Sequence, residues 1–247
     1  MLQPKEKRSY NHKALNRVLG KALHRYDMID HGDRIVLGLS GGKDSLTLMW
    51  FLFERLARVP IDYELFPVYV DPGFEGGYGE ELKAWCRNRG YPLRVEYTDF
   101  GLTAHSRENR ENPCFLCSRL RRKRLFEIAD ELNCGKLALG HHKDDIIETL
   151  FMNMCYAGEI STMKPSQSFF KGKFMIIRPL ACADEDSIRR FARSMDFPEY
   201  ENPCPSASVS KRREVKEMLK KLYRSNKKIK GNIFRSMSHV REGYLLK

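Results

Sequence analysis

The sequence predicts an α/β protein built on an open, doubly wound, parallel five-stranded sheet, with helical extensions at the N- and C-terminal ends. Short β-rich runs alternate with longer helical stretches, a pattern typical of right-handed βαβ crossovers. A Gly-Gly turn joins the first of these runs directly to a helix, at the kind of edge where open α/β sheets bind ligands. The chain has 247 residues, 42% of them hydrophobic, so it can bury a core of this kind.

The expected elements follow one another in a regular order. Strands are expected at 34–39, 64–70, 93–97, 136–140 and 174–178. Helices are expected at 45–58, 79–89, 118–133, 144–156 and 184–195. Residues 9–30 predict a helix before the sheet, and the tail from Lys211 predicts one or two basic helices with a break at Gly231. We therefore expect an N-terminal extension (1–30), a central domain (31–205) and a basic helical tail (206–247).

The positive charge of the chain is concentrated at its ends. Of the net charge of +12, residues 211–247 carry +10 and residues 1–25 carry +6, which leaves −4 for residues 26–210. Solvated helix faces explain many such runs, but a mildly acidic body with basic ends favours a polyanionic partner. An internal basic block at 119–124 adds to this surface. The cations expected to contact the polyanion are Arg119, Arg121, Arg122, Lys211, Arg212 and Arg213.

The composition also limits where the chain is expected to work. The longest apolar run, Leu48–Phe53, is far shorter than the roughly 18 residues of a membrane span. The first twenty residues contain no apolar stretch of the kind found in secretory signals. Seven cysteines, an odd number, favour reduced thiols in the cytoplasm over a disulfide framework. The helix at 45–58 is apolar nearly all round, which indicates deep burial or a homodimer seam.

The first expected strand leads into a candidate phosphate-binding loop, Ser40-Gly41-Gly42-Lys43-Asp44-Ser45. Its glycines allow a tight turn that brings amide groups against an anion, and the following helix adds its N-terminal partial charge. The Ser40 and Ser45 hydroxyls can donate hydrogen bonds, and Lys43 can neutralise phosphate charge. Asp44 stands between Lys43 and Ser45, so the loop does not have Walker spacing. A simple capped turn is the alternative, but strand, loop and helix in register favour phosphate binding.

The fourth expected strand ends in a second polar loop, Gly140-His141-His142-Lys143-Asp144-Asp145. The carboxyl ends of parallel strands share one edge of a sheet, so this loop is expected to face the same crevice as the phosphate loop. Adjacent carboxylates at a helix start are often only caps. Together with the histidines at a strand end, however, Gly140, His141, Asp144 and Asp145 are expected to bind Mg²⁺ and ATP.

Three cysteines occur in two matching contexts. The tetrapeptide Glu-Asn-Pro-Cys ends at Cys114 and again at Cys204, and the first copy continues to Cys117 as C-x-x-C. Because Asn-Pro favours turns, we expect these cysteines in loops that meet at one end of the sheet. Structural zinc, a redox pair and coincidence all remain open for a C-x-x-C, with His105 as a candidate fourth zinc ligand. Three thiolates suit a [4Fe–4S] cluster with one open iron.

The other four cysteines are expected to be inert packing residues: Cys86, Cys134, Cys155 and Cys182.

Several of these motifs resemble those of a known family. Ser40–Ser45 resembles the SGGxDS signature of the PP-loop pyrophosphatase superfamily, which has an adenine-nucleotide α-hydrolase-like fold and adenylates substrates. The run CFLCSRLRR from Cys114, LGHHKDDIIETLF at 139–151, IRPL at 177–180 and a later Pro-Cys occur in order. Together they resemble the TtcA-like tRNA 2-thiocytidine synthetases, from about residue 15 to about residue 240.

The resemblance implies an ATP-dependent tRNA sulfurtransferase, with Ser40–Ser45 holding the phosphates beside Mg²⁺ and Cys114, Cys117 and Cys204 holding a [4Fe–4S] cluster. The implied reaction is thiolation of cytidine 32 by adenylation of the base and then sulfur transfer. Catalytic roles are expected for Lys43, Asp44 and Asp144. A partner protein that donates sulfur, such as a cysteine desulfurase, is also expected. Asp71 matches a nucleotide- or metal-contacting position, although an Asp before Pro72 can also simply form a turn.

One departure from the family pattern leaves the subgroup and substrate open. Some members carry a further cysteine three residues after the last ligand, where this chain has Ala207. Thiolation of another tRNA base would use the same parts. A lysidine-type or amidating PP-loop synthetase would share the ATP site but would not need three converging cysteines. A zinc-stapled RNA-binding protein would explain the basic ends and the C-x-x-C, but not the two ATP-binding signatures.

Overall fold

A computed structural model describes residues 10–206 and 211–245 of the chain. Two compact units are present, one formed by residues 1–142 and 165–208 and the other by residues 143–164 and 209–247. Residues 1–9 of the basic N-terminal end lie outside the described residues, as does Ala207.

The first unit is built on a sheet whose strands in the described residues are β1 (Asp33–Leu39), β2 (Tyr63–Asp71), β3 (Arg94–Tyr97), β4 (Lys136–Leu139), β5 (Ser166–Phe169) and β6 (Phe174–Ile177). Their order across the sheet is β3-β2-β1-β4-β6-β5. All neighbours pair in parallel except β5, which runs antiparallel to β6 at the edge. The five expected parallel strands are therefore confirmed, and a short polar edge strand was not expected.

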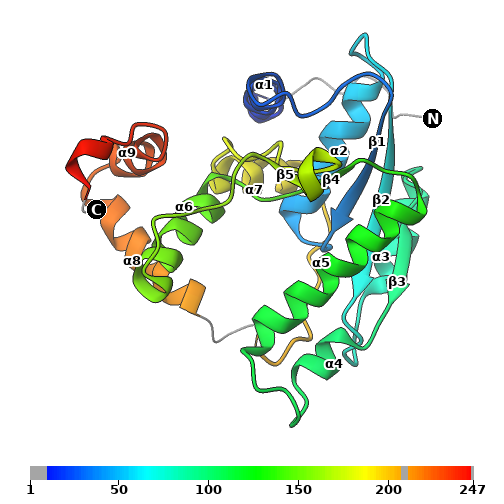
Figure 1. The fold of residues 1–247 in the computed structure, drawn as a ribbon. Helices are drawn as coiled ribbons and strands as arrows, with labels where there is room; N and C mark the ends of the chain where they lie inside the picture. The colour runs from blue at the N-terminus through cyan, green and yellow to red at the C-terminus, as the bar shows by residue number, and fades with distance from the viewer. Residues whose placement is uncertain (1–9, 207–210, 246–247) are drawn as a thin grey trace. The chain divides into compact units, whose positions relative to one another are not determined.

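Helices cover both faces of this sheet (Figure 1). Ile35, Leu37 and Leu39 of β1 face one core, which also contains buried side chains of α1 (Tyr10–Arg25), α2 (Lys43–Leu56), α3 (Gly79–Asn88) and α7 (Glu185–Ser194). Val36, between them, faces the other core with α5 (Pro113–Glu131). This alternation is what period-two side chains of a strand buried on both faces require. The doubly wound α/β architecture is confirmed.

The apolar character of α2 is explained by burial within this unit. Leu46, Leu48, Phe51 and Leu52 are fully buried in the first core. They pack with residues of α1 and α7, including Phe191, whose ring centroid lies 4.9 Å from that of Phe51.

Helix α5 begins five residues earlier than the expected start at Ser118. Asn112 is its N-cap, with a side-chain oxygen that accepts the Phe115 N–H at 3.2 Å, and Pro113 occupies the first helical position. Asn followed by Pro is a favourable helix start because the cap satisfies a free N–H and Pro has none to satisfy. Cys114 and Cys117 therefore lie in the first two turns of a helix, and the expectation that they lie in a loop is wrong. A short helix, α4 (Phe100–Ala104), precedes them.

The second unit is helical throughout its described elements. Helix α6 (Lys143–Met152) continues into a π-helical turn (Asn153–Ala157), and α8 (Lys211–Ser225) and α9 (Ile229–Ser236) follow later in the chain. Ile147 of α6 packs against Val215 and Leu219 of α8 in a small separate core. Gly231 lies inside α9, so the expected break there is wrong. The chain breaks instead at 226–228, where the Asn226 side chain accepts the Lys228 N–H at 2.8 Å.

Two single turns of 3₁₀ helix complete the described elements, at Phe170–Gly172 and Glu242–Tyr244. Within residues 10–206 and 211–245, none of the helices has the length and apolar character needed to cross a membrane.

Candidate active site: a phosphate loop and three cysteines

The candidate site begins where the strand order reverses. Strands β2 and β3 lie on one side of β1, whereas β4 and β6 lie on the other, so the reversal falls between β1 and β4. These two strands pair in parallel, with Gly38 opposite Leu139. The Ser40–Ser45 loop and the Gly140–His142 loop thus leave neighbouring strand ends. Ligands of doubly wound sheets bind at such a switch point.

The Ser40–Ser45 loop is closed by its own hydrogen bonds. The Ser40 N–H donates to the Ser45 hydroxyl at 3.1 Å, and that hydroxyl donates to the Gly42 carbonyl at 2.9 Å. The Gly42 N–H points to the Ser40 hydroxyl at 3.4 Å. Helix α2 starts directly after Gly42 with no side-chain cap. Its first amide groups therefore remain available to an anion.

Two glycines make this arrangement sterically possible. Gly41 has φ of +73°, in the left-handed region that favours glycine. A Cβ on Gly140 would lie 2.9 Å from the backbone nitrogen of Ser45, so only glycine lets the end of β4 approach the start of α2 this closely. The sequence-predicted residues Ser40, Ser45 and Gly140 are thus brought together.

Charged side chains form a chain of contacts beside the loop. Lys43 Nζ lies 3.1 Å from Asp44 Oδ2 and 3.3 Å from Glu185 Oε1, and Glu185 also contacts Arg189 at 3.0 Å. Asp44 Oδ1 lies 3.7 Å from Nε2 of the buried His142 and is itself buried without a hydrogen-bond donor. A carboxylate oxygen without a hydrogen-bond donor, next to a candidate phosphate loop, is a suitable ligand for Mg²⁺.

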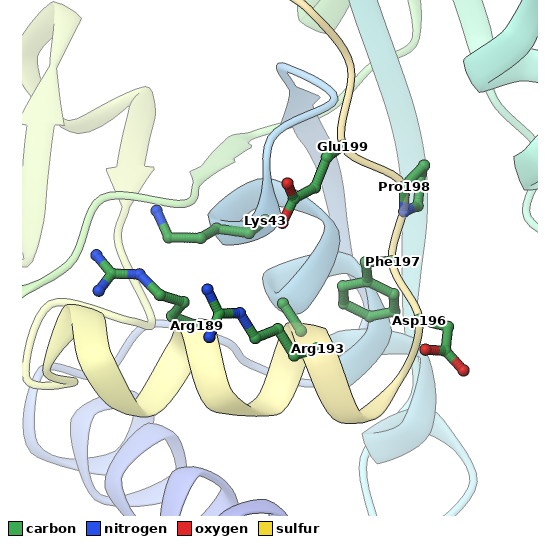
Figure 2. Close-up of a pocket in the computed structure, with 8 residues that line it drawn as sticks. Lys43, Arg189, Arg193, Asp196, Phe197, Pro198 and Glu199 are labelled. Atoms are coloured by element: carbon green, nitrogen blue, oxygen red, sulfur yellow. The ribbon is translucent and has the colours of Figure 1, made fainter.

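A pocket of about 210 Å³ adjoins this chain of charges (Figure 2). Figure 2 shows the Lys43 side chain at the start of α2 and the Arg189 and Arg193 side chains on α7, and all three line the pocket. Carboxylates of Asp196 and Glu199 also line the pocket, so its charges are mixed.

Asp71, at the end of β2, is buried and engaged in a turn. Its Oδ1 accepts the Gly73 N–H at 2.8 Å. A Cβ on Gly79, the first residue of α3, would lie 2.9 Å from Asp71 Oδ2, so the carboxylate lies close against the start of that helix. This contact is the turn-forming one, and a nucleotide or metal role for Asp71 stays a prediction.

The remaining predicted acidic ligands belong to the second unit. Asp144 and Asp145 lie in the first turn of α6. There Asp144 is ion-paired with Lys230 of α9, and Asp145 Oδ1 lies 3.8 Å from Arg212 of α8. Arg212 also lies 3.7 Å from the buried Glu148. Lys211 and Arg213 are exposed at the start of α8. His141, in the first unit, is half-buried.

The three predicted ligand cysteines are all free thiols that influence one another. Cys114 is exposed, whereas Cys117 and Cys204 are half-buried. Burial raises the pKa of Cys114, and the neighbouring Cys204 raises it further. At Cys117 burial also raises the pKa, Arg121 opposes that rise, and Cys204 and Cys114 add to it. Cys204 is therefore within electrostatic reach of both Cys114 and Cys117.

These thiols do not form a finished metal site. In the part of the chain that the structure describes, no three His, Cys, Asp or Glu side chains are placed together to hold a metal ion. His105, the candidate fourth ligand, is engaged elsewhere: Nδ1 lies 2.9 Å from the Gly101 carbonyl and Nε2 lies 2.7 Å from the Ser206 hydroxyl. Cys86 and Cys134 are buried as expected, but Cys155 is exposed, so the expectation of a packing role for it is wrong.

The arginines of the internal basic block differ in their exposure to solvent. Arg119 is exposed and pairs with Glu111 at 2.9 Å, Arg121 is half-buried near Cys117, and Arg122 is exposed. The sequence reasoning assigned no role to Arg178, which follows β6. Burial, aided by Arg122, lowers the pKa of Arg178 to about 10. The sequence does contain a signal for Arg178, because a cation directly after an apolar run lies at the strand end where such sheets bind ligands. A buried cation at that place needs a partner.

Comparison with known families places the chain. The PP-loop domain family matches residues 11–221. A tRNA-cytidine(32) 2-sulfurtransferase of Geotalea daltonii is 36% identical over 95% of this chain and 94% of its own length. The chain belongs to the PP-loop family of tRNA 2-sulfurtransferases. A further enzyme of that name, from Pelobacter propionicus, is 37% identical over 94% of this chain and 87% of its own length.

Solved structures agree with this placement. The U34-tRNA thiolase NcsA from Methanococcus maripaludis, solved with its [4Fe-4S] cluster, matches with a TM-score of 0.77 and 27% identity, over 93% of this chain and 78% of that chain. An NH3-dependent NAD synthetase from Campylobacter jejuni shares the fold alone, with a TM-score of 0.52 and 14% identity over 96% of this chain and 95% of that chain. This PP-loop sulfurtransferase is therefore an enzyme of an ATP-using family, and its PP-loop domain implies that it uses ATP and Mg²⁺.

Proposed function

We propose that this enzyme converts cytidine 32 of tRNA to 2-thiocytidine, with ATP as the activating substrate. One observation supports the proposal most strongly. The chain combines a candidate phosphate loop at the switch point with the three free thiols Cys114, Cys117 and Cys204, in a sequence 36% identical to a tRNA-cytidine(32) 2-sulfurtransferase. A nucleotide-binding protein without sulfur chemistry would need only the first of these features.

The first step proposed is adenylation of the base. The C2 oxygen of cytidine attacks the α-phosphate of ATP, a new oxygen–phosphorus bond forms, and the bond to the β-phosphate breaks to release pyrophosphate. Amide groups of the Ser40–Ser45 loop and the start of α2 hold the phosphates, and Lys43 neutralises charge that develops on them. Asp44 Oδ1 offers a ligand to Mg²⁺. Adenylation converts a poor oxygen leaving group into AMP.

The second step proposed replaces oxygen by sulfur. A sulfide equivalent adds to C2, and the carbon–oxygen bond breaks so that AMP leaves with the former C2 oxygen. No oxidant or reductant is consumed in this exchange, because sulfide replaces an oxygen of the same formal charge. The sulfur donor proposed is a protein such as a cysteine desulfurase. Such an enzyme carries sulfur as a persulfide, so a thiol reductant must first supply two electrons to release it as sulfide, and the thiol becomes a disulfide.

Cys114, Cys117 and Cys204 are the residues that would hold a [4Fe–4S] cluster. The donor set fits in kind, since all three residues are free thiols, Cys204 acts electrostatically on the other two, and iron–sulfur clusters take thiolate ligands. When bound, such a cluster would supply one iron without a cysteine ligand, which can carry the sulfide. Zinc is less suitable because the candidate fourth ligand, His105, already contacts Gly101 and Ser206.

We further propose that the exposed cations at the start of α8 and in α5 grip the tRNA backbone in the cytoplasm. All five cations are exposed: Lys211, Arg212, Arg213, Arg119 and Arg122. Lys211 also pairs with Glu214 at 3.2 Å, and Arg212 lies near Asp145 and Glu148. Replacing Lys211 and Arg213 by Gln should make the slope of log affinity for tRNA against log salt concentration less steep. The change should be that expected for the loss of about two phosphate contacts. A matched control is Lys171→Gln with Lys173→Gln, two exposed cations between β5 and β6. An unchanged salt slope in the α8 variant would assign these cations to a merely solvated face.

The decisive experiment is nucleoside mass spectrometry of tRNA from a strain that lacks this enzyme. Loss of 2-thiocytidine, restored by the wild-type chain, is the expected outcome. Retention of 2-thiocytidine together with loss of another thiolated base would contradict the assignment of the substrate. Iron and sulfide measured on the anaerobically purified protein are expected to show a cluster, and one zinc per chain would contradict the sulfur-transfer step.

A second candidate function is thiolation of uridine 34. It is favoured by the TM-score of 0.77 with a U34-tRNA thiolase. The higher identity to cytidine(32) enzymes, 36% against 27%, makes it the second choice. The same nucleoside analysis separates the two, because the lost nucleoside would be a 2-thiouridine derivative.

A further inference from the structure

Two tyrosine rings pack on the phosphate loop. Tyr78, the N-cap residue of α3, donates its hydroxyl to the Ser40 carbonyl at 2.7 Å. Its ring stacks on that of Tyr200, with centroids 4.6 Å apart and planes inclined by 7°. A Cβ on Gly41 would lie 2.6 Å from the Tyr78 ring and 3.2 Å from the Tyr200 ring. Both rings therefore contact the backbone of the turn that is expected to hold the phosphates of ATP.

Tyr78 itself is firmly supported from the sheet. Its other face meets Tyr69 of β2, with ring centroids 5.4 Å apart. The loop before it is tied down by Asp71, which accepts the Gly73 N–H. The stack Tyr69–Tyr78–Tyr200 thus begins at a buried strand and ends on a segment that has no regular secondary structure.

That last segment carries Cys204. It runs from Pro198 to Ser206 and includes two further prolines, Pro203 and Pro205, which restrict its backbone. The Asn202 side chain accepts the Cys204 N–H at 3.1 Å, which fixes the turn locally. At the far end, the Ser206 hydroxyl contacts His105 at 2.7 Å. A short, stiff segment held at both ends transmits a displacement at Tyr200 to Cys204 instead of absorbing it.

We propose that Tyr200, through its stack on Tyr78, is a positioning residue that couples ATP binding at the phosphate loop to the position of Cys204. This inference rests on the proposed function, because it assumes that the loop binds ATP. In this proposal, phosphate binding shifts the backbone at Ser40 and Gly41, which both tyrosines contact. The stack therefore carries the adjustment to the thiol that completes the sulfur site.

The test uses the full-length chain, free of cluster, with α,β-methylene-ATP and Mg²⁺ as the ligand. Alkylation of each cysteine by iodoacetamide is followed by peptide mass spectrometry, with the exposed Cys155 as an internal reference. In the wild type, the analogue should change the alkylation rate of Cys204 by about fivefold or more while that of Cys155 stays constant. In Tyr200→Leu the change at Cys204 should vanish, although the analogue still binds.

Conservative variants separate positioning from simple stability. Tyr200→Phe keeps the stacked ring and should respond like the wild type. Tyr78→Phe keeps its ring but loses the hydrogen bond to Ser40, and it should show a reduced response with an unchanged thermal unfolding midpoint. The inference is overturned if the wild type binds the analogue without any change at Cys204, or if Tyr200→Leu responds like the wild type. If the wild type does not bind the analogue at all, the proposed ATP-dependent function fails first.

Discussion

The phosphate loop and the cysteine site are assembled in different ways. The phosphate loop consists of six consecutive residues, Ser40–Ser45, whose hydroxyl and amide groups bond to one another. The proposed cysteine site would draw Cys114 and Cys117 from the start of α5 and Cys204 from a segment far along the chain. The hydrogen bonds of the Ser40–Ser45 turn form once β1 meets α2, whereas the proposed cysteine site would need two segments remote in sequence to pack together.

This difference has a physical consequence for how each site can be damaged. A local site fails when one of its own atoms is changed, and distant substitutions leave it intact. A site built from remote segments can also lose its geometry through residues that never touch the ligand. The following variants are chosen to break one site while the other serves as the control.

The largest effect is expected for Asp44→Ala. This change removes the carboxylate that contacts Lys43 at 3.1 Å and that we propose as a ligand of Mg²⁺. Loss of one such electrostatic contact to developing charge typically lowers turnover by about 10²–10³-fold. We expect tRNA-dependent pyrophosphate release to fall by at least this order, with the iron content of the protein unchanged. Asp62→Ala is the matched control because the Asp62 side chain is 97% exposed. Normal turnover in Asp44→Ala would remove Asp44 from the ATP site.

Cys204→Ser should affect the other site in turn. Serine keeps the size of the side chain but presents a harder oxygen that is poorly matched to iron. We expect loss of most of the bound iron and of thiolation, with ATP binding retained. Cys155→Ser, at an exposed cysteine of the second unit, should lose none of these properties. Iron analysis and 2-thiocytidine formation check both variants, and full iron in Cys204→Ser would rule out the three-cysteine site.

The same local-versus-remote distinction explains what could be predicted from the sequence. The five parallel strands and the turn at Gly41 follow from hydrophobic period and glycine placement, which are local signals. The start of α5 was misplaced because Asn112-Pro113 suits both a turn and a helix cap, and only packing of the helix selects one. Strand β5 was not expected because Ser166–Phe169 is short and polar and is selected by its pairing with β6.

The contacts that organise the site could be predicted from the sequence even less well. Glu185 reaches Lys43 from a helix more than a hundred residues later, and Tyr200 stacks on Tyr78 across a similar separation. Neither pair has a spacing that a helix or strand period could reveal. His142, next to the predicted His141, is the histidine that lies 3.7 Å from Asp44. Which of two adjacent residues faces a site depends on the loop conformation, which composition does not determine.

A smaller effect is expected for Gly140→Ala, which tests the close approach of β4 to the phosphate loop. The added Cβ would lie 2.9 Å from the Ser45 nitrogen, so a backbone must shift. We expect the KM for ATP to rise roughly tenfold and the free energy of unfolding to fall by ~1–3 kcal/mol, as overpacking typically costs. Gly135→Ala is the matched control, because nothing lies within 4 Å of its Cβ position. Iron content should be unchanged in both variants. An unaltered KM would show that the approach does not shape the ATP site.

The smallest effect concerns the attachment of α5, which carries Cys114 and Cys117, to the sheet. Glu96 of β3 accepts hydrogen bonds from Arg124 of α5 at 2.6 and 2.9 Å and from Arg94 at 2.9 and 3.2 Å. Burial alone would raise the pKa of Glu96, but the hydrogen bonds from Arg124 and Arg94 outweigh it and lower the pKa below its usual value of 4.5. The carboxylate is 21% exposed, so solvent screens these contacts only in part.

The sign of the pH dependence follows from that lowered pKa. A group whose pKa is depressed by folding stabilises the folded state above its unfolded pKa, here 4.5, and this contribution is lost as the pH falls through the folded pKa. Glu96→Gln should therefore be less stable than the wild type by ~1.5–3 kcal/mol at pH 7, the range for hydrogen bonds to charged groups. The difference in unfolding free energy should shrink as the pH drops below 4.5. Urea unfolding at several pH values checks this, with Glu127→Gln, whose side chain is 45% exposed, as the weaker control.

Since the phosphate loop is local, ATP affinity should stay constant in Glu96→Gln, whereas alkylation of Cys114 and Cys117 should increase as α5 loosens. A stability difference that persists unchanged at low pH would mean that shape, and not the charge of Glu96, holds α5 in place.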